Sequence, residues 1–194
     1  GDLIEELVLF LAGVSGHRVE GRQEELVLDG IEGHRDAIID GQLVDVKSAS
    51  GYGFKKFRDG ISPESDAFGY LTQLAAYKVA GGEDGKKDGA FIAVNKETGE
   101  ICVDYHEDLP TEDIPGIIAR AKQAVSLPEP PSRHYKDEED GKSGNRKLGT
   151  ACSYCQWKST CWPGIRGYAY SGGPRFLTNV AREPDVPEFK VWRP

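Results

Sequence analysis

The sequence contains no methionine and no apolar run long enough to cross a membrane. Without such a run we expect no membrane partner and a cytoplasmic location. The opening segment GDLIEELVLFLAG is acidic where an export signal would be basic, so we expect no secretion signal. Because even an initiator methionine is missing, we expect the sequence to begin inside a longer gene product.

An excess of basic charge is also lacking, since the formal net charge is −8. At face value this charge argues against a polyanionic partner. The objection is weak, because acidic residues can be concentrated at a metal site while a local basic rim contacts the polyanion. With 38% hydrophobic and 29% charged residues, the composition is that of a soluble globular protein, and 194 residues suffice for one α/β domain with a small appendage.

Cysteine is scarce and unevenly distributed. The four cysteines are Cys102, Cys152, Cys155 and Cys161, and three of them are crowded into ten positions. A secreted disulfide framework would spread its cysteines more evenly along the chain. We therefore expect reduced cysteines in an intracellular protein, with the clustered ones binding a metal.

Residues 33–50, GHRDAIIDGQLVDVKSAS, predict a β-hairpin with Asp40-Gly41 as its turn. Pairing of the two strands brings Asp36 near Asp45 and Lys47, which lie two apart and so share one strand face. Charged groups on an apolar strand cost free energy unless they bind something. The pattern indicates a hard divalent cation held by both Asp residues, with Lys47 left to orient a nucleophile or to stabilise a developing negative charge.

Hydrophobic periodicity predicts further helices and strands around this hairpin. The first helix ends near residues 13–16, and its apolar stripe consists of Leu3, Ile4, Leu7, Val8 and Leu11. The other expected elements are strands within residues 17–28, a loop over 48–63, a helix over 66–79, a hairpin over 89–107, a helix over 114–125 and irregular chain over 127–132. We divide the chain into a core of residues 1–130, a mobile linker of residues 131–149, and residues 150–194, an irregular cysteine module and tail packed on the core.

The predicted loop over residues 48–63 mixes basic and aromatic side chains, which suits phosphate contacts beside base or sugar stacking. Its candidate DNA contacts are Phe54, Lys55, Lys56 and Arg58. A solvated basic loop with anchoring aromatic residues is the alternative interpretation.

Two other predicted helices carry polar residues that can face a cleft. On the first, Glu5 lies at the edge of the apolar stripe, whereas Glu6 is expected to face solvent. On the helix over residues 66–79, Gln73 and Tyr77 lie four apart and so share one face.

Asp36, then Asp45-Val46-Lys47, then the Gln73–Tyr77 segment together resemble the PD-(D/E)XK nuclease superfamily, in particular its RecB-like exonuclease branch. The resemblance covers the chain from its first residue to about residue 110. It implies a restriction-endonuclease-like core, in which a mixed central β-sheet is flanked by helices. A lone Asp-x-Lys motif is common by chance, but these three motifs in this order are a specific signal.

The resemblance also implies a role for each matched residue. Mg²⁺ or Mn²⁺ would be held by Asp36, Asp45, the backbone carbonyl of Val46 and an acidic residue of the first helix. That acidic residue is Glu5 here, where the helicase-associated members of the family carry His. Lys47 would position the attacking water, and Gln73 and Tyr77 would support the site and the DNA backbone.

The spacing Cys152-x2-Cys155-x5-Cys161 resembles the C-terminal part of the iron–sulfur staple of several RecB-like nucleases, which holds a 4Fe-4S cluster. The fourth cysteine of that staple precedes the nuclease core, and no cysteine does so here. A residue upstream of Gly1, Cys102 or His134 could complete the site. The alternatives are a Zn²⁺ site and a metal-free cluster packed as core.

We therefore expect a metal-dependent DNA exonuclease, encoded by a phage or acting in bacterial recombination and repair. A recombination or single-strand-binding protein is a further partner that this resemblance implies. The alternatives are an endonuclease of the same superfamily, a non-catalytic DNA-binding module that retains the nuclease fold, and a zinc-stapled interaction protein.

Overall fold

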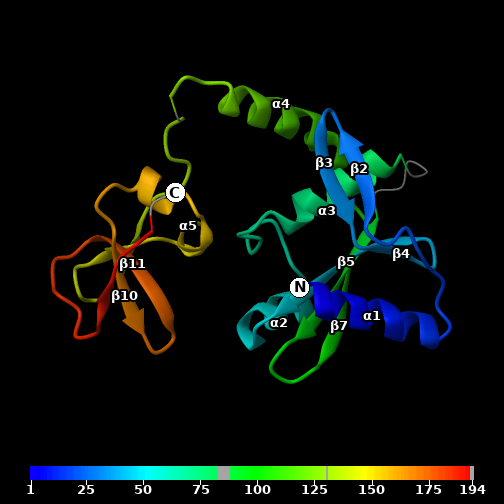
Figure 1. The fold of residues 1–194 in the computed structure, drawn as a ribbon, viewed down its shortest axis with the longest axis horizontal. Coiled ribbons are helices and arrows are strands. Elements are labelled where there is room, and N and C mark those ends of the chain that lie inside the picture. The colour runs from blue at the N-terminus through cyan, green and yellow to red at the C-terminus, as the bar shows by residue number, and fades with distance from the viewer. Residues whose placement is uncertain (83–87, 130, 193–194) are drawn as a thin grey trace. The chain divides into compact units, whose positions relative to one another are not determined.

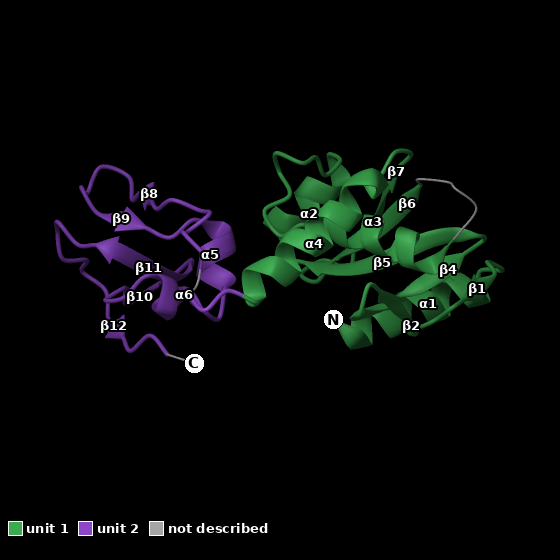
Figure 2. Ribbon diagram, turned by 90° about the horizontal axis from the view of Figure 1, so that it is seen from above, with its two compact units in different colours: residues 1–126 green, residues 127–194 purple. Residues whose placement is uncertain are grey.

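The computed structural model describes residues 1–82, 88–129 and 131–192, and it divides into two compact units (Figure 1). Unit 1 comprises residues 1–126 and unit 2 residues 127–194, as coloured in Figure 2. Unit 1 contains a mixed sheet with flanking helices, and unit 2 contains a separate antiparallel sheet. The predicted α/β class is confirmed at this level. Among the described residues, no helix is both long and apolar enough to span a membrane.

Unit 1 is built on a five-stranded mixed sheet. From one edge to the other it consists of β1 (Val19–Glu20), β4 (Ala37–Ile39), β5 (Gln42–Ala49), β6 (Gly89–Asn95) and β7 (Ile101–His106). Strands β5 and β6 are parallel, and the other neighbouring pairs are antiparallel. A separate hairpin consists of β2 (Glu24–Leu28) and β3 (Ile31–Arg35). The strands predicted within unit 1 are thereby confirmed.

Asp-Gly turns set the register of two of these hairpins. Between β4 and β5, Asp40 has φ 51° and Gly41 has φ 83°, and between β2 and β3 the values are 50° for Asp29 and 73° for Gly30. A two-residue turn with both φ angles positive twists in the same sense as the strands that it joins. The Asp40 carboxylate also lies 2.7 Å from Nδ1 of His17. Asp40 is therefore the turn residue that its sequence position predicts.

Among the described residues of unit 1, five helical segments accompany the sheet. They are α1 (Asp2–Val14), α2 (Gly51–Arg58), α3 (Tyr70–Gly81), the 3-10 helix η1 (Thr111–Asp113) and α4 (Ile114–Val125). The predicted bounds of α4 are confirmed. Helix α3 begins after the predicted start because the Asp66 carboxylate accepts hydrogen bonds from the backbone N–H groups of Tyr70 and Leu71, at 3.0 and 2.9 Å, ahead of the first turn. In Figure 2, β5 runs between α1 and the helices α2 and α3.

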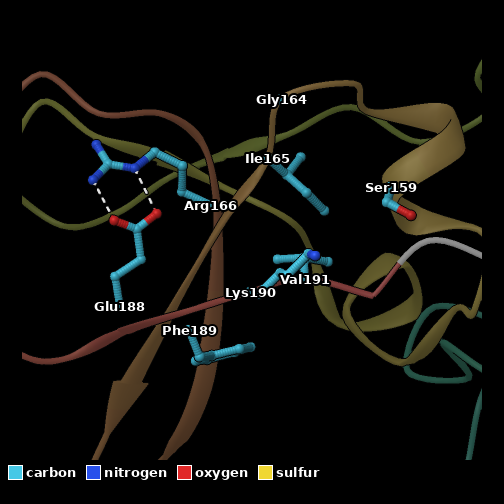
Figure 3. Close-up of a pocket in the computed structure, with 8 residues that line it drawn as sticks. All are labelled: Ser159, Gly164, Ile165, Arg166, Glu188, Phe189, Lys190 and Val191. Atoms are coloured by element: carbon cyan, nitrogen blue, oxygen red, sulfur yellow. Dashed lines mark hydrogen bonds and ion pairs between the residues drawn. The ribbon is translucent and has the colours of Figure 1, made fainter.

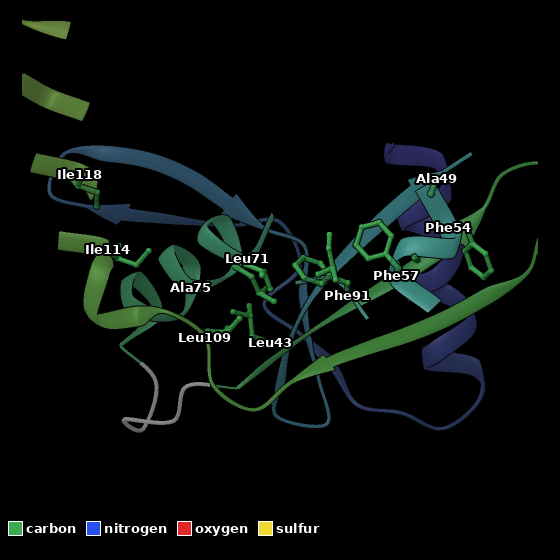
Figure 4. Packing of buried hydrophobic residues seen from close by; sticks show 13 residues of the cluster. Leu43, Ala49, Phe54, Phe57, Leu71, Ala75, Phe91, Leu109, Ile114 and Ile118 are labelled. Carbon is green, nitrogen blue, oxygen red and sulfur yellow. The ribbon is translucent and has the colours of Figure 1, made fainter. Parts of the chain in front are cut away.

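The core of unit 1 lies between the sheet and helices α2 and α3 (Figure 4). The phenyl rings of Phe57 on α2 and Phe91 on β6 meet edge to face, with centroids 5.5 Å apart. The other buried members of this cluster are Leu43, Ala49, Phe54, Ile61, Leu71, Leu74, Ala75, Ala93, Leu109, Ile114 and Ile118. Residues 43 and 49 of β5 point into this core together with Asp45 and Lys47, because alternate residues of a strand share one face.

The prediction of a loop over residues 48–63 is wrong for its central part, which forms helix α2. The two glycines of GYGFKKFR weaken its helical signal. The helix forms because Ser50 caps its first turn, accepting a hydrogen bond from Gly53 N, and because Phe54 and Phe57, three apart, both insert into the core. Tertiary packing thus overrides the local sequence preference.

Helix α1 is present as predicted, but of the predicted apolar stripe only Val8 is buried, and Leu3, Leu7 and Leu11 are exposed. Its buried residues are Val8 and Leu9, whereas Leu3 and Phe10 are 83% and 61% exposed. The helix carries apolar side chains on two sides, so periodicity alone does not determine which side packs on the sheet. The orientation that forms places the half-buried Glu5 on the same side of the helix as Val8 and Leu9, which follow it by three and four residues.

Unit 2 contains a five-stranded antiparallel sheet and two short helices. In order across the sheet the strands are β12 (Glu188–Phe189), β10 (Arg166–Tyr170), β11 (Gly173–Asn179), β9 (Arg146–Lys147) and β8 (Glu138–Glu139). The helices are α5 (Thr150–Tyr154) and α6 (Lys158–Cys161). The prediction of a mobile linker over residues 131–149 is wrong, because this segment contains β8 and β9. The prediction of an irregular tail is also wrong, because the tail contains β10, β11 and β12. Residue 130, in the predicted irregular stretch 127–132, and residues 193–194 of the predicted tail lie outside the described residues.

The sheet of unit 2 has its own small core. Tyr168 and Leu177 are each 1% exposed. A Cβ atom at Gly167 would lie 2.6 Å from the ring of Phe189, so only glycine lets β12 pack this closely on β10. The buried Asn145 side chain hydrogen-bonds both the N–H and the C=O of Arg182, each at 2.8 Å. Short strands and tertiary side-chain bonds of this kind leave little periodic signal in the sequence.

Candidate active site

The predicted site residues meet where β5 extends beyond its neighbour β4. The β4 ladder ends at the pair of Ala37 and Val44, so the following residues of β5 have an open edge on that side. Asp36, which directly precedes β4, turns its carboxylate to this edge and accepts a hydrogen bond from Val46 N at 2.7 Å. In an extended strand the N–H and C=O of one residue point to the same side, so the Val46 carbonyl also faces this edge.

Asp45 and Lys47 form a close pair on the core face of β5. The Asp45 residue is 3% exposed, and its Oδ2 lies 2.7 Å from Lys47 Nζ. This oxygen makes the ion-pair contact but no hydrogen bond of favourable geometry with any described residue. A buried carboxylate in this condition retains the capacity to bind a further cation.

Helix α3 supplies a chain of polar contacts to the same lysine. Lys47 Nζ donates to Oε1 of Gln73 at 3.2 Å, and Gln73 Nε2 donates to the Tyr77 hydroxyl at 3.1 Å. The Tyr77 ring in turn packs against Gly33 of β3, where an added Cβ would lie 2.9 Å from its Cε1 atom. The structure therefore brings Asp45, Lys47, Gln73 and Tyr77 together as the motif spacing predicts.

Helix α1 brings Glu5, rather than Glu6, toward the site. Glu5 is half-buried, and its Oε1 accepts a hydrogen bond from Gln23 Nε2 at 2.6 Å. Glu6 is exposed and pairs with Arg22 at 2.5 Å. The expected exposure of Glu6 is confirmed.

The pKa values of Glu5, Asp36 and Asp45 are all raised above their ordinary values. Burial is the largest cause for each carboxyl. Mutual repulsion adds to the rise in pKa: Asp45 acts on Asp36, Asp36 on Glu5, and Glu5 on Asp45. Lys47 lowers the pKa of Asp45 and Asp36 but does not cancel the rise. A divalent cation bound between these three partly buried carboxylates would reduce their mutual repulsion.

The donor set is chemically suited to a hard cation such as Mg²⁺ or Mn²⁺, because it consists of carboxylates and a backbone carbonyl. The described residues nevertheless contain no group of three or more His, Cys, Asp and Glu side chains already placed to hold a metal ion. Asp36 and Glu5 are instead hydrogen-bonded to Val46 N and Gln23. The residues fit the ion in charge and donor type, and its binding would exchange contacts that the carboxylates now make with the protein.

Sequence reasoning missed two contributors to the site. Gln23 has φ 49°, and it holds Glu5 from the turn before β2. The Tyr70 ring, one turn before Gln73 on α3, lies under Lys47 Nζ at 4.7 Å from its centroid. The spacing of Tyr70 from Gln73, three residues on a predicted helix, was the available signal for the second.

The predicted DNA contacts on residues 54–58 are only partly exposed. Phe54 is 2% exposed and belongs to the core, so its predicted role in base stacking is wrong. Lys55 and Arg58 are exposed on α2. The exposed aromatic residue of this helix is Tyr52, at 78%, and Lys56 Nζ lies 5.5 Å from its ring centroid.

Of the three clustered cysteines, Cys152 lies on α5, Cys155 directly follows that helix, and Cys161 ends α6. Burial, followed by the proximity of Cys155 and Cys161, raises the pKa of the Cys152 thiol. Cys152 and Cys155 are half-buried, and Cys161 is exposed. Cys102 lies on β7 of unit 1. Among the described residues the three thiols are not placed as a group that could hold a metal ion, and no His, Asp or Glu joins any of them in such a group.

A cavity of about 440 Å³ in unit 2 is lined by residues that none of the site predictions names (Figure 3). Two of its lining side chains, Arg166 and Lys190, are cationic. Arg166 is fully engaged, with Nη2 2.7 Å from Glu183 and 2.6 Å from Glu188. Its buried hydroxyl, that of Ser159, donates to the Trp192 carbonyl at 3.0 Å. Arg166 and Ser159 are thus satisfied within the protein, and the cavity does not gather the carboxylates that the site at β5 brings together.

Substitution Asp36→Asn should stabilise the metal-free protein at about pH 7 by a few tenths to about 1 kcal/mol, a range that allows for solvent screening. The amide oxygen can still accept from Val46 N, while the repulsion with Asp45 is removed. Because the native pKa of Asp36 is raised, the stability that it contributes is present at low pH and is lost as pH rises through that pKa. The gain from Asn should therefore shrink toward about pH 4. Urea unfolding of both proteins with a chelator, at about pH 7 and about pH 4, measures the gain in the free energy of unfolding. An equal gain at the two pH values would contradict this account.

Similarity to known proteins adds no assignment to the site. No model of a protein family matches the sequence, and no curated protein matches it either. The function proposed below therefore rests on the geometry of these residues and on the resemblance of their motifs.

Proposed function

We propose that unit 1 is a metal-dependent DNA exonuclease of the RecB-like type, acting in phage or bacterial recombination and repair. The observation that carries the proposal is the contact chain from Asp45 through Lys47 and Gln73 to Tyr77 beside the carboxylate of Asp36. Residues from three separate sequence segments converge there in the order and spacing of the motif.

Each residue has a role that its position allows. Asp36, Asp45, Glu5 and the Val46 carbonyl would hold Mg²⁺ or Mn²⁺, which supplies an activated water and neutralises charge on the phosphate. Lys47 lies beside Asp45, where its ammonium can orient the attacking water or contact a phosphate oxygen. Gln73 fixes Lys47, and Tyr77 fixes Gln73.

Two alternatives share this site. An endonuclease of the same superfamily would use the same groups, but the glutamine–tyrosine pair of α3 favours the exonuclease branch. A non-catalytic DNA-binding module would have no need for the buried Asp45 beside the half-buried Lys47, because burying a charge costs free energy. Retention of the whole contact chain therefore favours catalysis.

Digestion of end-labelled linear and covalently closed circular DNA, with Mg²⁺, with Mn²⁺ or with a chelator, tests the proposal. We expect metal-dependent loss of linear DNA and little loss of the circle. The matched control is Lys47→Ala, which should still bind metal and DNA. Its cleavage rate should be lower by about 100-fold or more, the contribution that a positioned proton-handling group makes.

Each other outcome has a defined meaning. Equal degradation of circular and linear DNA would indicate an endonuclease. No degradation by the unaltered protein with either metal would indicate a binding module. Full activity of Lys47→Ala would remove the assigned role of this residue.

Helix α2 is the proposed DNA contact, with Tyr52 in the stacking role first given to Phe54. Tyr52→Ala should weaken binding of a short single-stranded oligonucleotide by on the order of 5- to 100-fold, the loss of one base–aromatic stack. Tyr52→Phe, which keeps the ring, should retain affinity. Fluorescence anisotropy in a chelator measures binding without cleavage, and equal losses in both variants would point to the hydroxyl instead of stacking.

For the cysteine module we propose a metal-binding role, with a 4Fe-4S cluster ahead of Zn²⁺. Anaerobically purified protein should then show broad visible absorbance, and Cys155→Ser should abolish it, because fewer thiolates remain to hold the cluster. A colourless protein containing about one zinc per chain would support the second metal. A colourless protein without iron or zinc would leave the cysteines as packing residues.

A further inference from the structure

Lys47 is held by a third group that the motif does not include. Besides Asp45 Oδ2 at 2.7 Å and Gln73 Oε1 at 3.2 Å, its ammonium lies 4.7 Å from the centroid of the Tyr70 ring. A cation within about 6 Å of an aromatic face is attracted by the ring quadrupole. The ammonium therefore has an anion, a dipole and a π face around it.

The position of the Tyr70 ring is itself well supported. Its centroid lies 5.7 Å from that of Phe57 and 6.3 Å from that of Phe91, both core residues. Its backbone N–H is hydrogen-bonded to the Asp66 carboxylate, which caps α3. Aromatic contacts and the cap thus attach Tyr70 to the rigid part of unit 1.

One stripe of α3 carries the whole arrangement. Tyr70, Gln73 and Tyr77 are spaced three and four apart, so they project from the same side of the helix. Gln73 receives a hydrogen bond from Lys47, and Tyr77 receives one from Gln73. Tyr70 completes this side with the face of its aromatic ring.

A π face and a hydrogen-bond acceptor affect the ammonium differently. Lysine has three N–H donors. One donates to Gln73 Oε1, and the ion-pair contact with Asp45 can engage a second, although Asp45 Oδ2 accepts no hydrogen bond of favourable geometry from any described residue. The ring attracts the charge without accepting the remaining N–H through a lone pair. That N–H stays available for a water molecule or a phosphate oxygen.

We propose that Tyr70 is a positioning residue, whose ring face holds the Lys47 ammonium in place while leaving one N–H for the reacting groups. The proposal rests on the nuclease function proposed above only for the identity of those groups. The contact between the Tyr70 ring and the Lys47 ammonium, here called the clamp, is a property of the metal-free chain. It can therefore be tested without DNA.

The test is the rate of trace acetylation of Lys47 in metal-free protein, measured by mass spectrometry. Tyr70→Leu should raise this rate on the order of three- to tenfold, since the ring contact is lost. Tyr70→Phe should leave the rate near that of the unaltered protein. Trifluorophenylalanine at the same position keeps the shape but removes the negative face, so it should behave like Leu even if Tyr70→Leu itself fails to fold.

Tyr52→Leu is the matched control, because it removes the ring that lies 5.5 Å from Lys56. It should raise the acetylation rate of Lys56 and leave that of Lys47 unchanged. Tyr70→Leu should raise the acetylation rate of Lys47 and leave that of Lys56 unchanged. A rise at both lysines in either variant would show general loosening of the fold and overturn the clamp. Unchanged Lys47 acetylation with the trifluorinated ring would also overturn it.

Cleavage kinetics separate this proposal from the proposed function. Tyr70→Leu should lower kcat more than it raises KM for DNA, because the ring acts on Lys47 and not on DNA affinity. Tyr70→Phe should restore kcat. If the unaltered protein cleaves no DNA but the acetylation pattern is as expected, the clamp stands and the nuclease function fails.

Discussion

Burial of the Asp45 carboxylate next to Lys47 is the constraint around which unit 1 is arranged. Taking two charges out of water costs several kcal/mol per ion, and their attraction offsets this only when the geometry is good and further polar contacts are made. Here Gln73 supplies an acceptor and Tyr70 a ring face, both to the lysine. The carboxylate is left less well satisfied than the ammonium, which is the asymmetry that suits a cation site.

The ends of the strands determine where this pair can be reached. Because β4 stops at Ala37, the edge of β5 is open beside Val46, and Asp36 occupies part of it. Glu5 approaches from helix α1. A longer β4 would cover the edge with a backbone ladder and exclude these acids. The site therefore depends on a missing strand segment as much as on the residues present.

Stability and proposed function oppose each other at these acids. Their raised pKa values mean that the folded protein, without a cation, holds carboxylates in a setting that favours the neutral form. A cation bound only by the folded state would stabilise it through the same groups. Residues that satisfy Glu5 and Asp36 within the protein, Gln23 and the Val46 N–H, reduce the cost of the metal-free state.

Much of unit 1 follows from the sequence alone. The Asp-Gly turns, the strand that carries Asp45 and Lys47, helix α4 and the pairing of Gln73 with Tyr77 are all readable, because turn chemistry and short periodicities are local properties. What the tertiary structure decided is of another kind: that GYGFKKFR is a helix with Phe54 inside and Tyr52 outside, that α1 buries Val8 and Leu9, and that Tyr70 lies under Lys47. In unit 2 the tertiary structure also decided that residues expected to form a linker and an irregular tail pair as strands. Strands β8, β9 and β12 are two residues long, too short to give a periodic pattern in the sequence. Each of these depends on contacts between segments far apart in the chain, and no local pattern encodes which of two apolar faces, or which of several aromatic rings, a distant residue will meet.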